Sequence, residues 1–358
     1  MRTRDRSGMV RAMALLGFAA LLATQQACTT NAATGRSQLN LISRNQEIAM
    51  GAGAAPELTK EYGGEVADAG VRSYVRSIGE ELAQHTEADY PSLPWEFTVL
   101  DSDVINAFAL PGGKVFISRA LAEKLTNEAQ LASILGHEIG HVTAQHVDER
   151  MSRQYGLAIG GSLLGALASG SESQWGAIGA QAAITGAGLY ALSFDRNQES
   201  ESDALGIRYM VRAGYNPIGS LQAMQVLADE AGGSGGGVQD WFTTHPHPGT
   251  RVGRIRDILE RDHPGALSSP DENVFADRYR SNMLRPLGVA MAGDEEPIIA
   301  ASAMSERRVR RGVRSVPTLG VMNLPGAHHG ASNHDALWCS LCTRQQDEAI
   351  RFKIEAVE

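Results

Sequence analysis

The chain has 358 residues, of which 43% are hydrophobic and 20% are charged, and its formal net charge is −9 at pH 7. A chain of this length holds roughly two domains and can bury a sizeable core. The composition excludes a collagen-like, a wholly disordered or a disulfide-dense protein, and three cysteines cannot build a disulfide framework. The acidic balance argues against nucleic acid as the main partner.

The N-terminus has the features of a secretory signal. Four arginines precede a short apolar run at 12–23, which is too short to span a bilayer comfortably. We therefore predict a signal peptide over residues 1–27, with cleavage before Cys28 and lipid attached to that cysteine. Two glutamines before it are unusually polar for a lipobox, so ordinary cleavage and an uncleaved anchor are the alternatives. The small polar residues that follow predict a lipidated tether over residues 28–45.

Helical and strand-like patterns alternate in the next part of the chain. Apolar residues recur with helical periodicity over 48–53 and 66–85, and alternation over 95–100 predicts a strand. Residues 106–110 and 114–118 favour β-structure and flank a Pro-Gly-Gly turn, which predicts a hairpin. These patterns indicate an α+β fold.

Two further helices are predicted in the middle of the chain. Asn127 followed by Gln130 is an Asn variant of the capping box and predicts that a helix begins there. A second helix is expected from about residue 195 to 213, where a glycine follows. The Gly- and Ala-rich segment 156–192 lies between them. Buried helices or a helical flap are favoured there over a membrane hairpin.

The first of these helices carries an HExxH motif, His137-Glu138-Ile139-Gly140-His141. Residues four apart on a helix lie about 40° apart, so His137 and His141 can reach one zinc ion. Glu138 then lies where it can activate a water at the metal. A surface pair of histidines is the alternative, which the apolar, N-capped setting disfavours. The motif predicts a zinc site with Glu138 as the general base.

A third metal ligand must come from elsewhere in the chain. The positions that hold a Gly and a third His in metzincins are Ala144 and Val147 here, which excludes that class. His146 lies about 180° around the helix from His137. We therefore predict that His146 is a structural or surface residue.

The second helix offers carboxylates. Glu199 and Asp203 share one helix face, so we predict that Glu199 is the third zinc ligand and that Asp203 orients a ligating imidazole. Glu201 points about 200° away from Glu199 and is predicted to lie at the surface or in a helix cap. A solvated acidic helix start is the alternative for all three residues.

Four stretches resemble the zinc metallopeptidase family of HtpX and the CAAX prenyl endopeptidases, and within it the branch of periplasmic lipoproteins that includes BepA and LoiP. They are residues 106–113, the HExxH motif, Glu199-xxx-Asp203 before Gly206, and Thr244-His245-Pro246 with Arg251 beyond. The resemblance covers about residues 28–262. It implies a mainly helical gluzincin core with a small sheet or hairpin beside the HExxH helix. We expect this metallopeptidase domain to span residues 46–291 and to hold one zinc ion.

The resemblance also implies roles for individual residues. In this branch the histidine of the matching His-Pro occupies the open coordination position of zinc. His245 is therefore expected to be a latch, a residue that blocks this position until it moves away. A loop histidine beside a rigid proline is the alternative. Either His245 or Arg251 would supply a donor to the oxyanion. Four residues of the predicted hairpin are expected to bind extended, unfolded substrate by strand addition: Asn106, Ala107, Phe108 and Ala109.

These features predict a zinc-dependent endopeptidase that cleaves misfolded or stalled envelope proteins on the periplasmic side of an outer membrane. Its partners would be unfolded or misassembled envelope proteins and, through the lipid on Cys28, the membrane. The alternative is a chaperone-like, largely non-proteolytic envelope factor on the same scaffold. A membrane-embedded prenyl-protein protease is less favoured, since the chain lacks enough spanning segments.

Residues 292–358 do not match the family and are predicted to be a disordered tail. An arginine run at 307–314 could contact anionic lipid, but a solvated tail is favoured. Cys339 and Cys342 match no zinc module and would oxidise in the periplasm rather than bind a second metal.

Overall fold

The computed structural model describes residues 28–154, 193–232, 239–245 and 248–290. The predictions for the signal peptide, for the Gly- and Ala-rich segment 156–192 and for the tail concern residues outside these ranges. Among the described residues, none of the helices combines the length and the apolar character that a membrane crossing requires.

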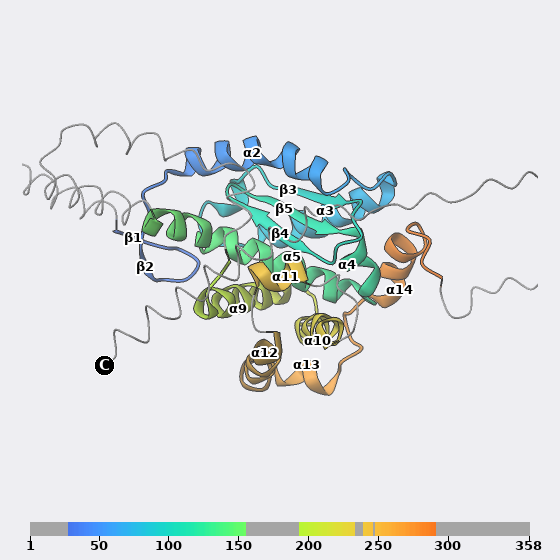
Figure 1. Cartoon of the computed structure of the whole chain (residues 1–358). Helices are drawn as coiled ribbons and strands as arrows, with labels where there is room; N and C mark the ends of the chain where they lie inside the picture. The colour runs from blue at the N-terminus through green and yellow to red at the C-terminus, as the bar shows by residue number, and fades with distance from the viewer. Residues whose placement is uncertain (1–27, 155–192, 233–238, 246–247, 291–358) are drawn as a thin grey trace, which may run out of the picture. The chain divides into compact units, whose positions relative to one another are not determined.

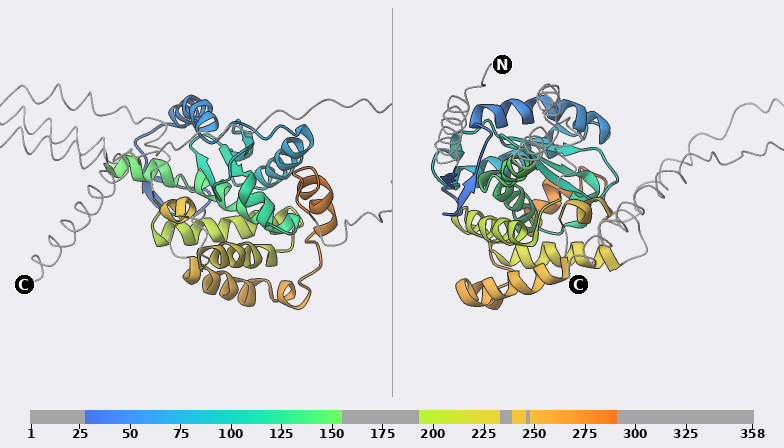
Figure 2. Two further views of the ribbon diagram at one scale, coloured as in Figure 1. Left: turned by 45° about the vertical axis from the view of Figure 1, so that its right-hand side comes forward. Right: turned by 60° about the vertical axis from the view of Figure 1, so that its left-hand side comes forward.

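Helices dominate the described part of the chain, and they surround a small sheet (Figures 1 and 2). The elements in chain order are β1 (Cys28–Thr30), β2 (Ser37–Leu39), α2 (Arg44–Glu61), α3 (Ala69–Gln84), η1 (Tyr90–Ser92), β3 (Glu96–Leu100), β4 (Ala107–Leu110), β5 (Lys114–Ser118), α4 (Arg119–Lys124), α5 (Glu128–Thr143), α9 (Arg196–Arg212), α10 (Ile218–Gly232), α11 (Gln239–Thr244), α12 (Pro248–Asp262), α13 (Pro264–Ser268), α14 (Ala276–Tyr279) and η4 (Arg280–Leu284). The mainly helical α+β class predicted from the sequence is confirmed.

The central sheet has the strand order β3-β5-β4. The predicted hairpin is confirmed, because β4 and β5 are antiparallel and Ala107 is paired with Ile117. Gly112 in its turn has a φ of 76°, a conformation that glycine adopts without steric cost. A Cβ there would also lie 2.5 Å from Cα of Ile48 in α2. The sequence did not reveal that β3 pairs in parallel with β5, which leaves β4 at the edge of the sheet.

Side chains alternate along each strand and point to the two faces of the sheet in turn. Each face packs against a different core, so both are covered. Val99, Val115 and Ile117 belong to the main core, together with apolar residues of α3 and α5. Phe108 and Phe116 belong to a second core, together with residues of α2. Accordingly, α2 and α5 lie on opposite sides of the sheet (Figure 1).

The two predicted motif helices, α5 and α9, are confirmed and lie side by side. Asn127 caps α5, because its Oδ1 accepts a hydrogen bond of 2.9 Å from the backbone N–H of Gln130. Asp195 caps α9 in the same way. Glycine allows the close approach of the two helices, since a Cβ on Gly206 would lie 2.9 Å from the backbone nitrogen of His137.

The segment predicted as a tether is structured. Strands β1 and β2 form an antiparallel hairpin that packs against the C-terminal end of α5. Nδ2 of Asn31 donates to the carbonyl of Thr143 at 2.9 Å, and Nε2 of Gln38 donates to that of Ala144 at 3.2 Å. The last carbonyls of a helix lack partners within the helix. The polar residues therefore serve buried hydrogen bonding rather than solvation, which is why composition alone was misleading.

The C-terminal part of the described chain is attached to the start of α5 through Glu128. This carboxylate is buried and accepts hydrogen bonds from the hydroxyls of Tyr74 at 2.5 Å and Tyr215 at 2.8 Å. It also pairs with Arg278 in α14. Three distant segments are thus held together by contacts to one buried carboxylate.

Candidate active site

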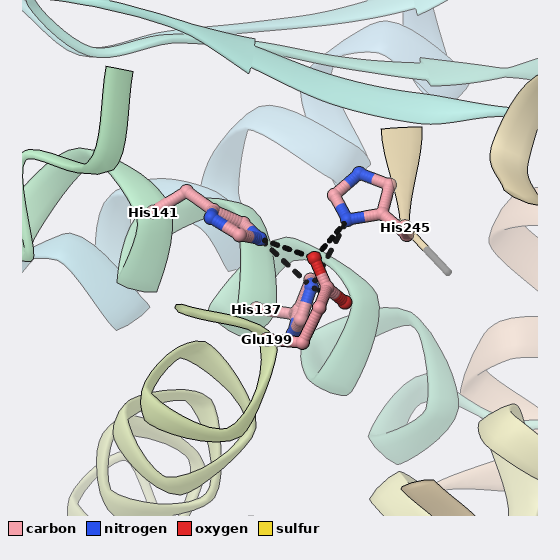
Figure 3. A group of neighbouring side chains, drawn as sticks. All are labelled: His137, His141, Glu199 and His245. Atoms are coloured by element: carbon pink, nitrogen blue, oxygen red, sulfur yellow. Dashed lines mark hydrogen bonds and ion pairs between the residues drawn. The ribbon is translucent and has the colours of Figure 1, made fainter. Parts of the chain in front are cut away.

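Three segments of the fold bring four potential metal ligands together. His137 and His141 come from α5, Glu199 comes from α9, and His245 directly follows α11. Their ligand atoms all lie within 4.8 Å of one another, and all four side chains are buried. Figure 3 shows the three imidazoles and the carboxylate pointing toward a common centre.

The spacing of these donor atoms fits a tetrahedral zinc ion. Nε2 of His137 lies 3.1 Å from Nε2 of His141 and 3.4 Å from Nδ1 of His245. Oε1 of Glu199 lies 3.4 Å from Nε2 of His141 and 3.0 Å from Nδ1 of His245. Ligands about 2.0–2.2 Å from a tetrahedral ion lie about 3.3–3.6 Å from one another. Small adjustments would therefore suffice to admit the ion.

Asp203 and Arg251 hold the ligands in place. Nδ1 of His137 lies 3.0 Å from Oδ1 of Asp203, and such a contact turns the other ring nitrogen toward a metal. Nε of Arg251 donates to Oδ2 of Asp203 at 3.0 Å, and its NH1 lies 2.7 Å from Oε2 of Glu199. Arg251 is 1% exposed, so one buried cation links the two carboxylates.

Burial and neighbouring charges shift the pKa values of these groups. Burial tends to raise the pKa of Glu199, but Arg251 and the neighbouring histidines hold it well below its ordinary range. Burial lowers the pKa of His141 well below its ordinary value. Burial and Arg251 also act to lower the pKa of His137, but Asp203 and Glu199 outweigh them and raise it to about 9. Ligands bind metal in their deprotonated forms, so a metal ion would displace the proton from His137.

Glu138 lies beside this group of metal ligands. The residue is 0% exposed, and within the described residues neither carboxylate oxygen has a hydrogen-bond partner. Nε2 of His245 lies 3.6 Å from Oε1 of Glu138. Burial raises the pKa of Glu138. A buried carboxylate is costly without a partner, so this one is suited to receive a proton from a molecule that enters the site.

The sequence profile of peptidase family M48 matches residues 71–259, a stretch that contains all four ligand residues. The chain belongs to peptidase family M48. It is 31% identical over 248 residues to the beta-barrel assembly-enhancing protease of Yersinia pestis, an alignment that covers 68% of this chain and 50% of that protein. The Escherichia coli K12 protein of the same name is 31% identical over 255 residues, with the same coverage.

A mitochondrial metalloendopeptidase OMA1 also aligns with this M48 chain. The protein from Schizosaccharomyces pombe is 28% identical over 228 residues, which cover 63% of this chain and 65% of the relative. The chain spans about half the length of the beta-barrel assembly-enhancing proteases that it matches.

His146 has the structural role that was one of its two expected roles, although not the expected position on the helix, and the prediction for Glu201 needs correction. His146 is 0% exposed, and its Nδ1 lies 2.8 Å from Nδ1 of His141. The helix-angle argument was wrong because α5 ends at Thr143 and Gln145 has a φ of 56°, so the chain turns before it continues. Glu201, predicted at the surface or in a cap, lies 3.1 Å from Nε2 of His146 and has a side chain only 24% exposed.

Two aromatic residues that belong to none of the sequence motifs enclose the site. The ring of Phe194 stacks on His141 with centroids 3.8 Å apart, and that of Trp241 stacks on His245 at 4.2 Å. Trp241 precedes His245 by four residues, a helical spacing that is a weak sequence signal. Phe194 offers no such signal, since only tertiary packing brings it to His141.

Strand β4 carries most of the predicted substrate strand. Ala107, Phe108 and Ala109 lie in β4, which α5 contacts directly. Asn106 precedes the strand, and its backbone N–H donates to Oγ of Ser118 at 3.0 Å. The edge of the sheet therefore runs past the helix that carries the HExxH motif.

Proposed function

We propose that this chain is a zinc-dependent endopeptidase that cleaves misfolded or stalled proteins of the cell envelope. The observation that carries the proposal is the buried carboxylate of Glu138, which has no hydrogen bond to any described residue and lies beside four converging metal ligands. A protein that used the metal only for structure would have no need of a general base at this position.

His137, His141 and Glu199 would hold the ion, as their donor distances indicate. Zinc in such a site polarises the scissile carbonyl and lowers the pKa of a water molecule to about 7. Glu138 accepts the proton of the attacking water and delivers it to the leaving amine. The upward shift of its pKa makes the carboxylate a stronger proton acceptor, which suits a general base.

Asp203 and Arg251 position the ligands. The guanidinium of Arg251 faces the carboxylates of both Asp203 and Glu199, which keeps it from serving as a free donor to an oxyanion. Its positive charge keeps Glu199 ionised, and its two-pronged geometry sets the angle between α9 and its own helix, α12.

His245 acts as a latch on the site. A catalytic zinc site keeps one position for water or substrate, whereas structural sites are filled by four protein ligands. Here Nδ1 of His245 completes a four-donor set with His137, His141 and Glu199, and stacking on Trp241 supports the imidazole. Peptide cleavage then requires His245 to move away.

Strand β4 is the docking edge for substrate. It is hydrogen-bonded to β5 on one side and ends the sheet on the other. An extended peptide can add to such an edge through its backbone, a mode of recognition that depends little on sequence. This suits unfolded or misassembled proteins as substrates.

Two observations support an envelope location. The basic and apolar N-terminus has the pattern of a secretory signal followed by Cys28. The relatives from Yersinia pestis and Escherichia coli are named for enhancing β-barrel assembly. Lipid on Cys28 would hold the enzyme at the membrane, and replacement of Cys28 by Ser should then move the protein from the membrane to the soluble fraction.

The endopeptidase is tested by cleavage of casein with zinc, with a chelator, and with the variant Glu138→Gln. These assays are run in both the wild-type and the His245→Ala background, because a closed latch hides activity. Cleavage that is lost with the chelator and with Glu138→Gln supports the proposal, and the exposed Glu80→Gln serves as the control that keeps activity. A folded, zinc-loaded His245→Ala variant that cleaves nothing would contradict it and favour a non-proteolytic, chaperone-like role.

A further inference from the structure

We propose that Arg36, Glu201 and His146 are positioning residues for the metal ligand His141, so that the N-terminal hairpin, residues 28–40, is a component of the metal centre. The inference rests on the metal site of the proposed function and extends it to Arg36 and its hairpin, which lie outside the family match at 71–259.

A continuous chain of hydrogen bonds joins these four side chains. Nε and NH2 of Arg36 donate to the carboxylate of Glu201 at 2.5 Å and 2.9 Å. Oε2 of Glu201 lies 3.1 Å from Nε2 of His146, and Nδ1 of His146 lies 2.8 Å from Nδ1 of His141. Nε2 of His141 faces the other metal ligands.

The order of donors and acceptors in this chain determines the tautomer of His141. The carboxylate of Glu201 is an acceptor, so Nε2 of His146 carries a hydrogen and donates. Nδ1 of the neutral His146 is then the acceptor, and Nδ1 of His141 donates to it. The lone pair on Nε2 of His141 is thereby directed at the metal position. A carboxylate that acts on a ligating imidazole through its second nitrogen raises the affinity of a metal site.

Arg36 is itself held firmly in the hairpin. Its carbonyl accepts from the backbone N–H of Asn31 at 2.8 Å, and Oδ1 of Asn31 accepts from the backbone of Ala33 at 2.8 Å. NH2 of Arg36 also lies 3.2 Å from Oε2 of Glu149. Arg36 therefore links α9 to the helical residues that follow α5.

The hairpin supports α5 at a second place. The amide side chains of Asn31 and Gln38 bind the last carbonyls of this helix, as described above. Figure 1 shows β1 and β2 beside α9 and the end of α5. The segment that directly follows the predicted membrane anchor thus contacts both helices that carry metal ligands.

A different reading of these contacts is that they only attach the hairpin to the body of the protein. The two readings differ in their effect on metal binding. If the contacts only attach the hairpin, their loss lowers the unfolding temperature equally with and without zinc. If they position His141, their loss weakens zinc binding by more than it destabilises the metal-free protein.

The test measures the zinc dissociation constant of the full chain by competition with a chromophoric chelator. The variants are Arg36→Ala, Glu201→Gln and His146→Leu. Each should weaken zinc binding by about 10- to 100-fold, as is typical when the partner of a ligating histidine is removed. The combination of Arg36→Ala with Glu201→Gln should weaken it by less than the product of the single effects, because both act through one chain.

Two further variants separate positioning from general damage. Gln in place of His146 can accept from His141 and donate to Glu201, so His146→Gln should bind zinc within a few-fold of wild type. Arg153 pairs with Glu149 at 2.5 Å but is not part of the chain to His141, so Arg153→Ala should leave zinc affinity unchanged. The visible spectrum of the cobalt-loaded protein should change with His146→Leu and not with Arg153→Ala.

Unchanged zinc affinity and an unchanged cobalt spectrum in Arg36→Ala and His146→Leu would overturn this inference while leaving the proposed endopeptidase intact. A wild-type chain that binds no zinc would overturn both. Thermal unfolding of the metal-free variants shows whether each is folded, and His146→Gln still decides the question if His146→Leu is not.

Discussion

Nδ1 of His245 lies 3.0 Å from Oε1 of Glu199, although the two residues come from different helical segments and are 46 positions apart. Both side chains are 1% exposed. The contact places a third imidazole where a catalytic zinc site would keep room for water. As the proposed latch, His245 would have to leave this position before a peptide could be cleaved.

Replacement of His245 by Ala should increase casein cleavage on the order of tenfold, which corresponds to a preference of about 1.4 kcal/mol for the closed state. Zinc should stay bound through His137, His141 and Glu199. The measurement is the initial rate at saturating zinc, with the half-exposed, distant His85→Ala as the control that keeps the wild-type rate. Unchanged or abolished cleavage in His245→Ala would contradict the latch.

Loss of Arg251 should destabilise the fold and the metal site together. Arg251→Ala leaves the buried carboxylates of Glu199 and Asp203 without their shared cation, and breaking a buried pair in this way costs about 3–5 kcal/mol. Denaturant unfolding measures this cost. The stability of Arg251→Lys should lie between those of wild type and Arg251→Ala, because lysine keeps the positive charge but cannot donate to both carboxylates in the geometry of a guanidinium. The exposed Arg256→Ala on the same helix should be near neutral. Equal stabilities for the two alanine variants would contradict the prediction.

The close contact between α5 and α9 should not tolerate a methyl group. Gly206→Ala would force the helices apart at the backbone of His137, with a loss of about 1–3 kcal/mol in stability and weaker zinc binding. Gly253 in α12 is the matched control, because a Cβ there meets nothing within 4 Å. Gly253→Ala should stabilise the protein by up to about 1 kcal/mol. Similar unfolding free energies for both variants would show that the helix contact is more adaptable than its geometry indicates.

Glu47 in α2 should make stability fall as pH rises. Burial and the nearby Asp148 raise its pKa from 4.5 to about 7, so the folded protein favours the protonated acid. The stability that this preference contributes is present below pH 4.5 and is lost as pH rises through 7. Glu47→Gln cannot ionise, and its free energy of unfolding should exceed that of wild type by on the order of 2 kcal/mol at pH 8.

The difference between Glu47→Gln and wild type should shrink toward pH 5, where the carboxyl of Glu47 is protonated in the folded state. Urea unfolding at several pH values measures it. Glu57 is exposed on the same helix, so the free energy of unfolding of Glu57→Gln should follow the same pH dependence as that of wild type. If the free energy of unfolding of Glu47→Gln also depended on pH as that of wild type does, the prediction that Glu47 is protonated in the folded state would be wrong.

Much of the fold followed from short-range patterns in the sequence. The helix start at Asn127, the hairpin around Gly112 and the helix after Asp195 were all predicted, because capping, turn chemistry and periodicity act within a few residues. His137 and His141 were predicted as metal ligands for the same reason, since a four-residue spacing on a helix is a local property. Their convergence with Glu199 needed only the assumption that the two helices pack together.

Only the tertiary structure decided what surrounds those ligands. The rigid-helix argument placed His146 away from His141, whereas the break at Gln145 returns it to the site. Arg36 reaches Glu201 across 165 positions, and no local pattern encodes such a contact. Sequence alone thus determined the helices and the metal-binding motif, because these depend on neighbouring residues. The closing histidine and the support of His141 depend on how distant segments pack, which is settled only when the core forms.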